Sequence, residues 1–397
     1  MRKALFVLLG CACLAGCRKN QAEGYEYLES VLFTRVITPE EMLAKLEEYI
    51  PSTSYEGKLD EEREELDRFA AKAPNITAYG ISYRSVNPFG EPTVASGVVY
   101  VPALREPGNP VIESPPFSRS KFLCVSRQPD APDLAPAFTG HICLVSDQIG
   151  AGSSEDQCLN TFQHENIVRV AADFRKAAWE FLWRMHGIRL SSDSIICGYS
   201  LGGSSALAMA RYYDLHPEEG VRVKELWTGG GAYYLSTALS EQIEEDYSET
   251  ALMPSILWSL NHYLRLNLDF DSIFLDPVKD HPGVYTGEIS FPVATEMLGT
   301  QISAYLNFDV FGTGKPVFNQ VMEAIQVLDT DVRGWTPAYP VHLYHARDDK
   351  HVPRVCSDML YEALSGQGVR VQYTQMDVNH IAGSGQMYMD FLQSLVE

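Results

Sequence analysis

The hexapeptide Gly198-Tyr199-Ser200-Leu201-Gly202-Gly203 constrains the fold of this 397-residue chain more than any other feature. It lies between an apolar segment typical of a strand, residues 194–197, and a segment with helical spacing, residues 201–213. A serine at so tight a junction must adopt a strained backbone. We expect the flanking glycines to be needed, because a Cβ there would clash with the strand and the helix. The hydroxyl would project at the positive end of a helix dipole. This context predicts that Ser200 is a nucleophile; the alternative is a plain glycine-rich turn.

Strands and helices alternate along most of the chain from residue 76. Two alternating segments joined by an Asn-Pro-Phe-Gly turn, ITAYGISYRSV and TVASGVVYV, predict an antiparallel hairpin. Apolar residues at helical spacing predict a long helix over residues 167–185. Further short strands are predicted at residues 111–112, 141–146, 194–197, 225–228, 341–345 and 369–373. The alternation indicates an α/β protein with a mostly parallel sheet covered by helices on both faces.

Two segments depart from this alternation. Residues 17–75 are polar with helical spacing, and Thr38-Pro39-Glu40-Glu41 carries an N-cap, a proline at the first helical position and a capping-box glutamate. We expect this segment to be helical and to serve as packing elements or a stalk. Residues 237–334 also have helical spacing with no strand pattern. They predict a helical cap insertion between the two parts of the core, residues 76–236 and 335–397.

Residues 76–397 resemble the α/β-hydrolase superfamily. The paired early strands, the GYSLGG turn and the helical insertion look most like its secretory-lipase and esterase group. The resemblance implies an α/β-hydrolase fold, in which helices flank a mostly parallel central sheet. It also implies a catalytic triad in the chain order serine, acid, histidine.

The acid and the histidine of such a triad are sought after the insertion. Residues 340–353, PVHLYHARDDKHVP, are similar to the family's His-Gly-x-x-Asp-x-x-Val-Pro loop, with Ala346 in place of the glycine. Aligned on the Val-Pro pair, the acid is Asp349, and Asp348 is the alternative. His380 lies after the last predicted strand, where the resemblance places the histidine; the alternative is a capping or structural role. The acid would fix the histidine tautomer and stabilise its cation.

The oxyanion hole of the family needs two backbone donors. The residue after the nucleophile supplies one, which assigns Leu201. The other comes from the loop after the strand at residues 111–112, where relatives often carry His-Gly and this chain has ESPPFS, residues 113–118. Proline has no N–H to donate. We therefore assign the second donor to a neighbour of the two prolines, Phe117.

The N-terminus reads as an export signal. A basic start, Arg2-Lys3, precedes ten apolar or small residues, which are too few to span a bilayer. The tetrapeptide Leu14-Ala15-Gly16-Cys17 follows and resembles the bacterial lipobox. It implies a signal peptide over residues 1–16 and lipidation at Cys17, so we expect a membrane-anchored lipoprotein of the bacterial cell envelope. The alternative is an ordinary signal peptide with an incidental cysteine.

Cysteine usage and charge exclude other classes. Five cysteines remain beyond residue 17, an odd number with no CxxC pair, which argues against a zinc site or a thioredoxin-like motif. The net charge of −21 argues against nucleic-acid binding, which needs clustered lysine and arginine.

These features together predict a serine esterase or lipase that uses no metal and no organic cofactor. Its substrate would be a small-molecule or carbohydrate-linked ester. The insertion, with Trp258, Tyr263, Leu264 and Phe270, is expected to cap the pocket; the alternative for these side chains is plain helix packing. Two alternatives are a serine peptidase of the same fold and an inactive binding lipoprotein. The acyl and alcohol specificity and the oligomeric state are left open at this point.

Overall fold

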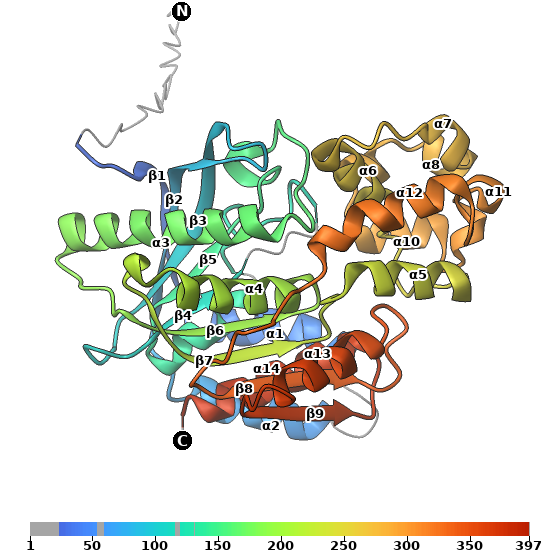
Figure 1. The fold of residues 1–397 in the computed structure, drawn as a ribbon. Helices are drawn as coiled ribbons and strands as arrows, with labels where there is room; N and C mark the ends of the chain where they lie inside the picture. Colours follow the sequence, from blue (N-terminus) through green and yellow to red (C-terminus); the bar gives the residue numbers. More distant parts are fainter. Residues whose placement is uncertain (1–23, 54–58, 116–119, 131, 397) are drawn as a thin grey trace, which may run out of the picture.

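A nine-stranded sheet organises the chain. The computed structural model describes residues 24–53, 59–115, 120–130 and 132–396. The strand order is β1-β2-β3-β5-β4-β6-β7-β8-β9 (Figure 1). The strands are β1 (Leu28–Ile37), β2 (Ile76–Val86), β3 (Pro92–Pro102), β4 (Val111–Ser114), β5 (Cys143–Ser146), β6 (Asp193–Tyr199), β7 (Arg222–Gly229), β8 (Val341–Ala346) and β9 (Val371–Met376).

The sheet changes from antiparallel to parallel at β5. Strands β1, β2, β3 and β5 pair in antiparallel fashion, and every pair from β5 through β9 is parallel. The predicted hairpin is present as β2 and β3, which pair from Ile76 with Pro102 to Val86 with Pro92. In the turn between them, Gly90 has a φ of 79°, a conformation that favours glycine. The parallel sheet sets the carboxyl ends of β6, β8 and β9 along one edge.

Helices cover both faces of the sheet, as predicted. On one face lie α3 (His164–His186), α4 (Leu201–Leu215) and α13 (Val355–Ser365), and the other carries η1 (Pro132–Thr139), α1 (Pro39–Thr53) and α14 (His380–Ser394). Side chains of β6 alternate between two apolar clusters. Ile196 packs in the cluster that includes α4, whereas Ile195 and Cys197 pack in the cluster that includes α14. Successive side chains of this parallel strand thus point to opposite faces of the sheet, and both faces are buried.

The N-terminal segment is only partly helical, so the prediction of an all-helical segment over residues 17–75 is wrong. Helices α1 and α2 (Leu59–Ala70) are present, and the Thr38–Glu41 capping box forms, with backbone-to-side-chain distances of 2.9 and 3.2 Å. Residues 28–37, however, form the edge strand β1, which pairs with β2. The register of that pairing shifts between Leu28 and Ser30 and between Val31 and Phe33, which interrupts the period-two pattern of a strand. Residues 1–23, including Cys17, lie outside the described residues.

The insertion between β7 and β8 is helical. Residues 237–334, all of which the structure describes, contain no strand. Its helices are α5 (Leu235–Glu245), α6 (Met253–Leu264), α7 (Phe270–Ile273), α8 (Asp276–Lys279), α9 (Gly283–Thr286), α10 (Phe291–Leu298), η4 (Ile302–Ala304), α11 (Phe308–Phe311), α12 (Pro316–Ile325) and η5 (Gln326–Leu328). Figure 1 shows this block at one end of the sheet, in yellow to orange. No helix among the residues described is both long and apolar enough to cross a bilayer.

Candidate active site

Ser200 sits on a strained turn between β6 and α4. Its φ of 60° and ψ of −127° are unusual for a residue with a side chain. Its N–H donates to the Gly229 carbonyl at 2.9 Å. A Cβ at residue 198 would strike the Gly202 carbonyl, and one at residue 203 would strike the Gly229 carbonyl. A Cβ at Gly202 would meet nothing within 4 Å. A steric clash therefore explains why glycine is needed at residues 198 and 203. The expectation that Gly202 is needed for the same reason is wrong.

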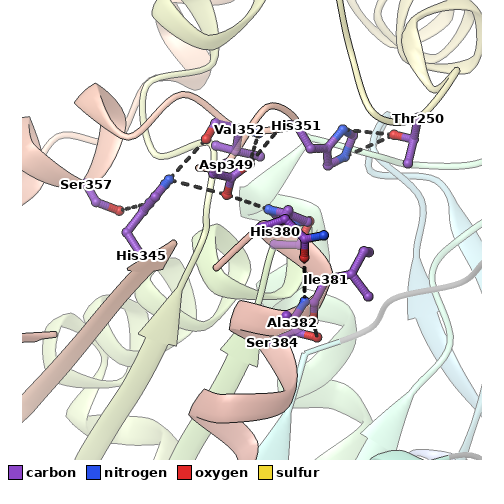
Figure 2. Close-up of polar contacts among 12 residues, drawn as sticks. Thr250, His345, Asp349, His351, Val352, Ser357, His380, Ile381, Ala382 and Ser384 are labelled. Carbon is purple, nitrogen blue, oxygen red and sulfur yellow. Dashed lines mark hydrogen bonds and ion pairs between the residues drawn. The ribbon is translucent and has the colours of Figure 1, made fainter. Parts of the chain in front are cut away.

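His380 contacts both other predicted triad members. It is the first residue of α14, whose N-cap Asn379 accepts a hydrogen bond from the Ala382 N–H at 2.9 Å. The His380 Nε2 lies 2.9 Å from the Ser200 Oγ, and its Nδ1 lies 2.6 Å from the Asp349 Oδ2 (Figure 2 shows the Asp349 contact). The carboxylate can only accept, so Nδ1 carries the proton and Nε2 is left to accept from the serine hydroxyl.

Asp349 is held by several donors in the loop after β8. Its Oδ1 accepts from the backbone N–H groups of His351 and Val352 at 2.9 and 2.7 Å, and its Oδ2 faces His380. Burial alone would raise the pKa of Asp349, but the charge and hydrogen bond of His380 outweigh it and lower the pKa. The alternative acid, Asp348, has an exposed side chain. The structure thus places Asp349, and not its neighbour, against the histidine.

Two further histidines lie beside this carboxylate. The Nε2 of His345 lies 3.0 Å from the Val352 carbonyl and 3.3 Å from the Asp349 Oδ2, and its Nδ1 lies 2.7 Å from the Ser357 hydroxyl (Figure 2). A carbonyl only accepts, so Nε2 carries the proton. Burial lowers the pKa of His345, so the ring is neutral, and its Nε2–H donates to the Val352 carbonyl while lying close to the acid.

The second of these, His351, packs directly on His380. Their ring centroids are 4.8 Å apart, and the His351 Nδ1 lies 2.8 Å from the Thr250 hydroxyl. Burial, and then the charge of His380, lower the pKa of His351 to about 3. It is therefore neutral at physiological pH. The signal for His351 was its place in the acid's own loop, two residues after Asp349, whereas His345 lies on β8, four residues before Asp349.

Comparisons with known proteins bear on the fold. No family model matches the chain, and no curated protein sequence is detectably similar to it. Solved structures are similar. A Legionella pneumophila protein assigned as a hydrolase has a TM-score of 0.74 at 18% identity, over 93% of this chain and 98% of that one. The rice cell wall degrading esterase LipA of Xanthomonas oryzae has a TM-score of 0.71 at 18% identity, over 92% and 96%. The chain has the α/β-hydrolase fold.

A more distant relative shares this α/β-hydrolase fold. Candida antarctica lipase A superposes with a TM-score of 0.59 at 12% identity, over 88% of this chain and 77% of that one. All three identities are low, so the likeness shows the fold alone. In open α/β sheets, ligand sites lie beyond the carboxyl ends of the strands. Ser200, Asp349 and His380 follow β6, β8 and β9 in just that position.

A cavity of about 850 Å³ opens beside Ser200 in this α/β-hydrolase fold. That volume is within the range of small-molecule sites. Most of its lining is apolar and comes from the core, the insertion and the N-terminal helices. Two of its lining residues are acidic, Glu249 and Glu296, and none of those that the structure describes is a lysine or an arginine. Burial, and then the charge of Asp349, raise the pKa of Glu249. A cavity of this character suits a neutral or cationic ligand better than an anionic one.

The two predicted oxyanion donors have different outcomes. Leu201 is the first residue of α4 and lines the cavity, and no backbone acceptor among the described residues pairs with its N–H. A first-turn amide of this kind is free to bind a ligand oxygen. Phe117 lies outside the described residues. The preceding Ser114 and Pro115 line the cavity, so the loop reaches the site.

The aromatic residues predicted to cap the pocket do not line it. Trp258 packs on Phe270 and Tyr285, with ring centroids 5.3 and 4.7 Å away, and the Tyr263 hydroxyl donates to the Cys158 carbonyl. These rings build the interior of the insertion. The insertion contributes aliphatic lining residues instead, among them Leu235, Leu239, Leu252, Ile256 and Ile289. Helical spacing identified the apolar residues but not which of them face the cavity.

Within the described ranges, no group of three or more His, Cys, Asp or Glu residues could hold a metal ion. None of the five cysteines beyond residue 17, all of which the structure describes, forms a disulfide. Burial raises the pKa of Cys124, Cys158 and Cys356 to about 12, so these thiols are poor nucleophiles at neutral pH.

Proposed function

We propose that this protein is a serine hydrolase that cleaves carboxylic esters through an acyl-enzyme. One observation carries the proposal: the Ser200 hydroxyl, the His380 ring and the Asp349 carboxylate form a continuous hydrogen-bonded chain, with steps of 2.9 and 2.6 Å, at the edge of an apolar cavity. A serine hydroxyl is a weak nucleophile unless a base of this kind removes its proton.

The proposed reaction has two halves. The Ser200 Oγ attacks the ester carbonyl while its proton passes to the His380 Nε2, and the tetrahedral intermediate collapses as that proton moves to the leaving alcohol. Water then attacks the acyl-serine, with His380 again acting as base. Asp349 stays ionised and stabilises the imidazolium that forms in each half. The N–H of Leu201 is one candidate donor to the oxyanion.

Esters are the substrates that we favour. Two of the similar structures are an esterase and a lipase, and the cavity has a mainly apolar lining that would bind a neutral acyl chain. The substrate would be a small-molecule or carbohydrate-linked ester, and the proposed steps use no metal or organic cofactor. We further propose, from the lipobox, that the enzyme works on a membrane to which lipidated Cys17 tethers it.

The test is labelling by a fluorophosphonate probe together with hydrolysis of nitrophenyl esters. Wild type should be labelled at Ser200, and Ser200→Ala should lose both label and activity. His380→Ala should lose nearly as much activity, and Asp349→Asn on the order of 10⁴-fold, as triad acids do elsewhere. Losses should not add in double variants, because removing one member disables the others. Asp348→Asn is the matched control and should be silent.

Two results would overturn the proposal. A folded wild type that neither reacts with the probe nor cleaves any ester would favour an inactive binding protein. Cleavage of peptide bonds in preference to esters would favour a serine peptidase of the same fold.

A further inference from the structure

One face of α14 lines the cavity well beyond the catalytic histidine. The lining residues recur every three or four positions, which places them on one side of the helix. They are Ile381, Ser384, Gly385, Tyr388, Met389 and Leu392. At about 1.5 Å of rise per residue, the stripe from Ile381 to Leu392 is about 16 Å long. The cavity therefore extends along the helix away from Ser200.

The N-terminal helices line the same part of the cavity. Leu46 of α1 and Leu66 of α2 reach it, together with Ala135 and Pro136 of η1. Helix α1 packs on α14 and lies in the apolar cluster that also contains the last turns of α14, and α2 packs on α1 (Figure 1, both in blue). We call the space between the α14 stripe and these four residues the α14 arm. The sequence alone indicated only packing elements or a stalk for these helices.

The chemistry of the α14 arm is that of a hydrocarbon site. None of its ten lining residues is charged. Of the two with hydroxyl groups, Ser384 donates its hydrogen to the Ile381 carbonyl at 2.8 Å. Gly385 and Ser384, the smallest lining residues on α14, lie within five positions of His380. The lining side chains of α14 are thus smallest near His380, which leaves the arm widest there. The arm is apolar along its length.

We propose that the α14 arm binds one unbranched hydrocarbon chain of the ester substrate, about twelve carbons long. The inference rests on the proposed function. A staggered alkyl chain advances about 1.25 Å for each C–C bond of about 1.52 Å, so about 16 Å accommodates roughly a dozen carbons. Apolar burial favours filling the arm, because each buried methylene adds to binding. The chain could belong to the acid or to the alcohol of the ester.

Two homologous series of esters show whether the bound chain belongs to the acid or to the alcohol. Nitrophenyl esters from acetate to palmitate vary the acid, and n-alkyl acetates from ethyl to hexadecyl vary the alcohol. In one of the two series, kcat/KM should rise by up to about fourfold per methylene and level off near twelve carbons. The other series should level off earlier, because its chain enters a different part of the cavity.

A tryptophan at Leu46 should block the arm. Leu46→Trp should lower kcat/KM for the twelve-carbon member of the responding series at least tenfold, while the two- to four-carbon members stay within twofold. Leu43→Trp is the matched control, on the same helix and similarly half-buried but outside the cavity lining, and should leave the profile unchanged. Normal short-chain activity shows that each variant folds.

A binding measurement separates this proposal from the proposed function. Dodecanol should raise the Tm of Ser200→Ala, which cannot turn over, and should not raise that of Ser200→Ala/Leu46→Trp. Such a shift supports the arm even if no ester is cleaved. Flat profiles in both series, equal losses for short and long chains in Leu46→Trp, or no dodecanol shift in Ser200→Ala would each overturn it.

Discussion

At the scale of single residues, the site depends on a strained serine and on what holds it. The positive φ of Ser200 costs on the order of 1–3 kcal/mol, which the surrounding packing must offset. Gly203 allows α4 to approach the Gly229 carbonyl on β7, and Gly198 allows β6 to pass under α4. Close backbone contact therefore keeps the turn in place.

We predict opposite effects for alanine at two adjacent glycines. Gly203→Ala should lower the free energy of unfolding by about 1–3 kcal/mol or more, because its Cβ would overlap a backbone carbonyl that cannot move freely. Gly202→Ala should leave stability unchanged or raise it by up to about 1 kcal/mol, because alanine favours helix and the position has space. Urea unfolding of both variants checks this, and equal destabilisation would show that the clash does not decide the outcome.

The neutral His351 predicts a pH dependence of stability. Its pKa is about 3 in the folded protein and about 6.5 in the unfolded chain, so below pH 6.5 the unfolded chain binds a proton that the folded one does not. Stability is therefore lost as pH falls from 6.5 toward 3, by up to about 1.4 kcal/mol per pH unit. His351→Gln should flatten this slope, whatever its effect on stability at pH 7.

Urea unfolding at pH 7, 6 and 5 would measure the slope. His281→Gln, at an exposed histidine, is the control and should keep the wild-type slope. The same slope in His351→Gln and wild type would contradict a buried neutral His351.

The three residues that the structure brings together at the candidate site could be picked out from the sequence because their signals are local. A strand–turn–helix junction marks Ser200, and loop motifs mark Asp349 and His380, each readable within about a dozen residues. The contacts of His345 and His351 depend on how one loop folds around a carboxylate, which spacing does not encode. Which glycine is sterically required likewise depends on β7, about 26 residues away in the chain.

At the scale of elements, local signals again account for what could be predicted. The capping box marked the start of α1, and uninterrupted alternation marked β2 and β3. Strand β1 was missed because its two register shifts break the period-two pattern and its partner, β2, lies some forty residues on. Pairing with a distant strand then decides whether such a segment folds as a helix or as a strand, which is common for irregular segments at the edge of a sheet.

The insertion leads to a prediction that separates specificity from stability. Leu252→Trp should narrow the cavity and lower kcat/KM for bulky esters more than for acetate, because Leu252 lines it. Trp258→Ala should instead lower stability by on the order of 1–3 kcal/mol, because its ring packs on Phe270 and Tyr285 inside the insertion. Ester profiles and thermal unfolding of both variants would distinguish the two roles. A changed ester preference in Trp258→Ala alone would reverse the assignment.

At the scale of the whole molecule, topology assembles the site from distant parts of the chain. Ser200 and His380 are 180 residues apart, and the whole insertion lies between Ser200 and Asp349. Parallel strands bring the three loops to one edge of the sheet, and the insertion and N-terminal helices close the cavity around that edge. The parallel sheet could be predicted from the alternation of strands and helices along the chain. The N-terminal contribution to the cavity could not, because it depends on where α1 and α2 pack.

The charge of the whole chain makes membrane association a sharp test of lipidation. With a net charge of −21, the protein should be repelled by anionic membrane surfaces, so any stable attachment must come from an apolar anchor. We predict that wild type expressed in a bacterial host sediments with membranes and stays there in 1 M salt, which screens charge but not hydrocarbon burial. Cys17→Ala should appear in the soluble fraction with unchanged esterase activity.

Cys158→Ala, at a cysteine beyond the lipobox, is the control and should still sediment. If Cys17→Ala remained with the membranes, or if mass spectrometry found wild-type Cys17 without lipid, the attachment would have another source.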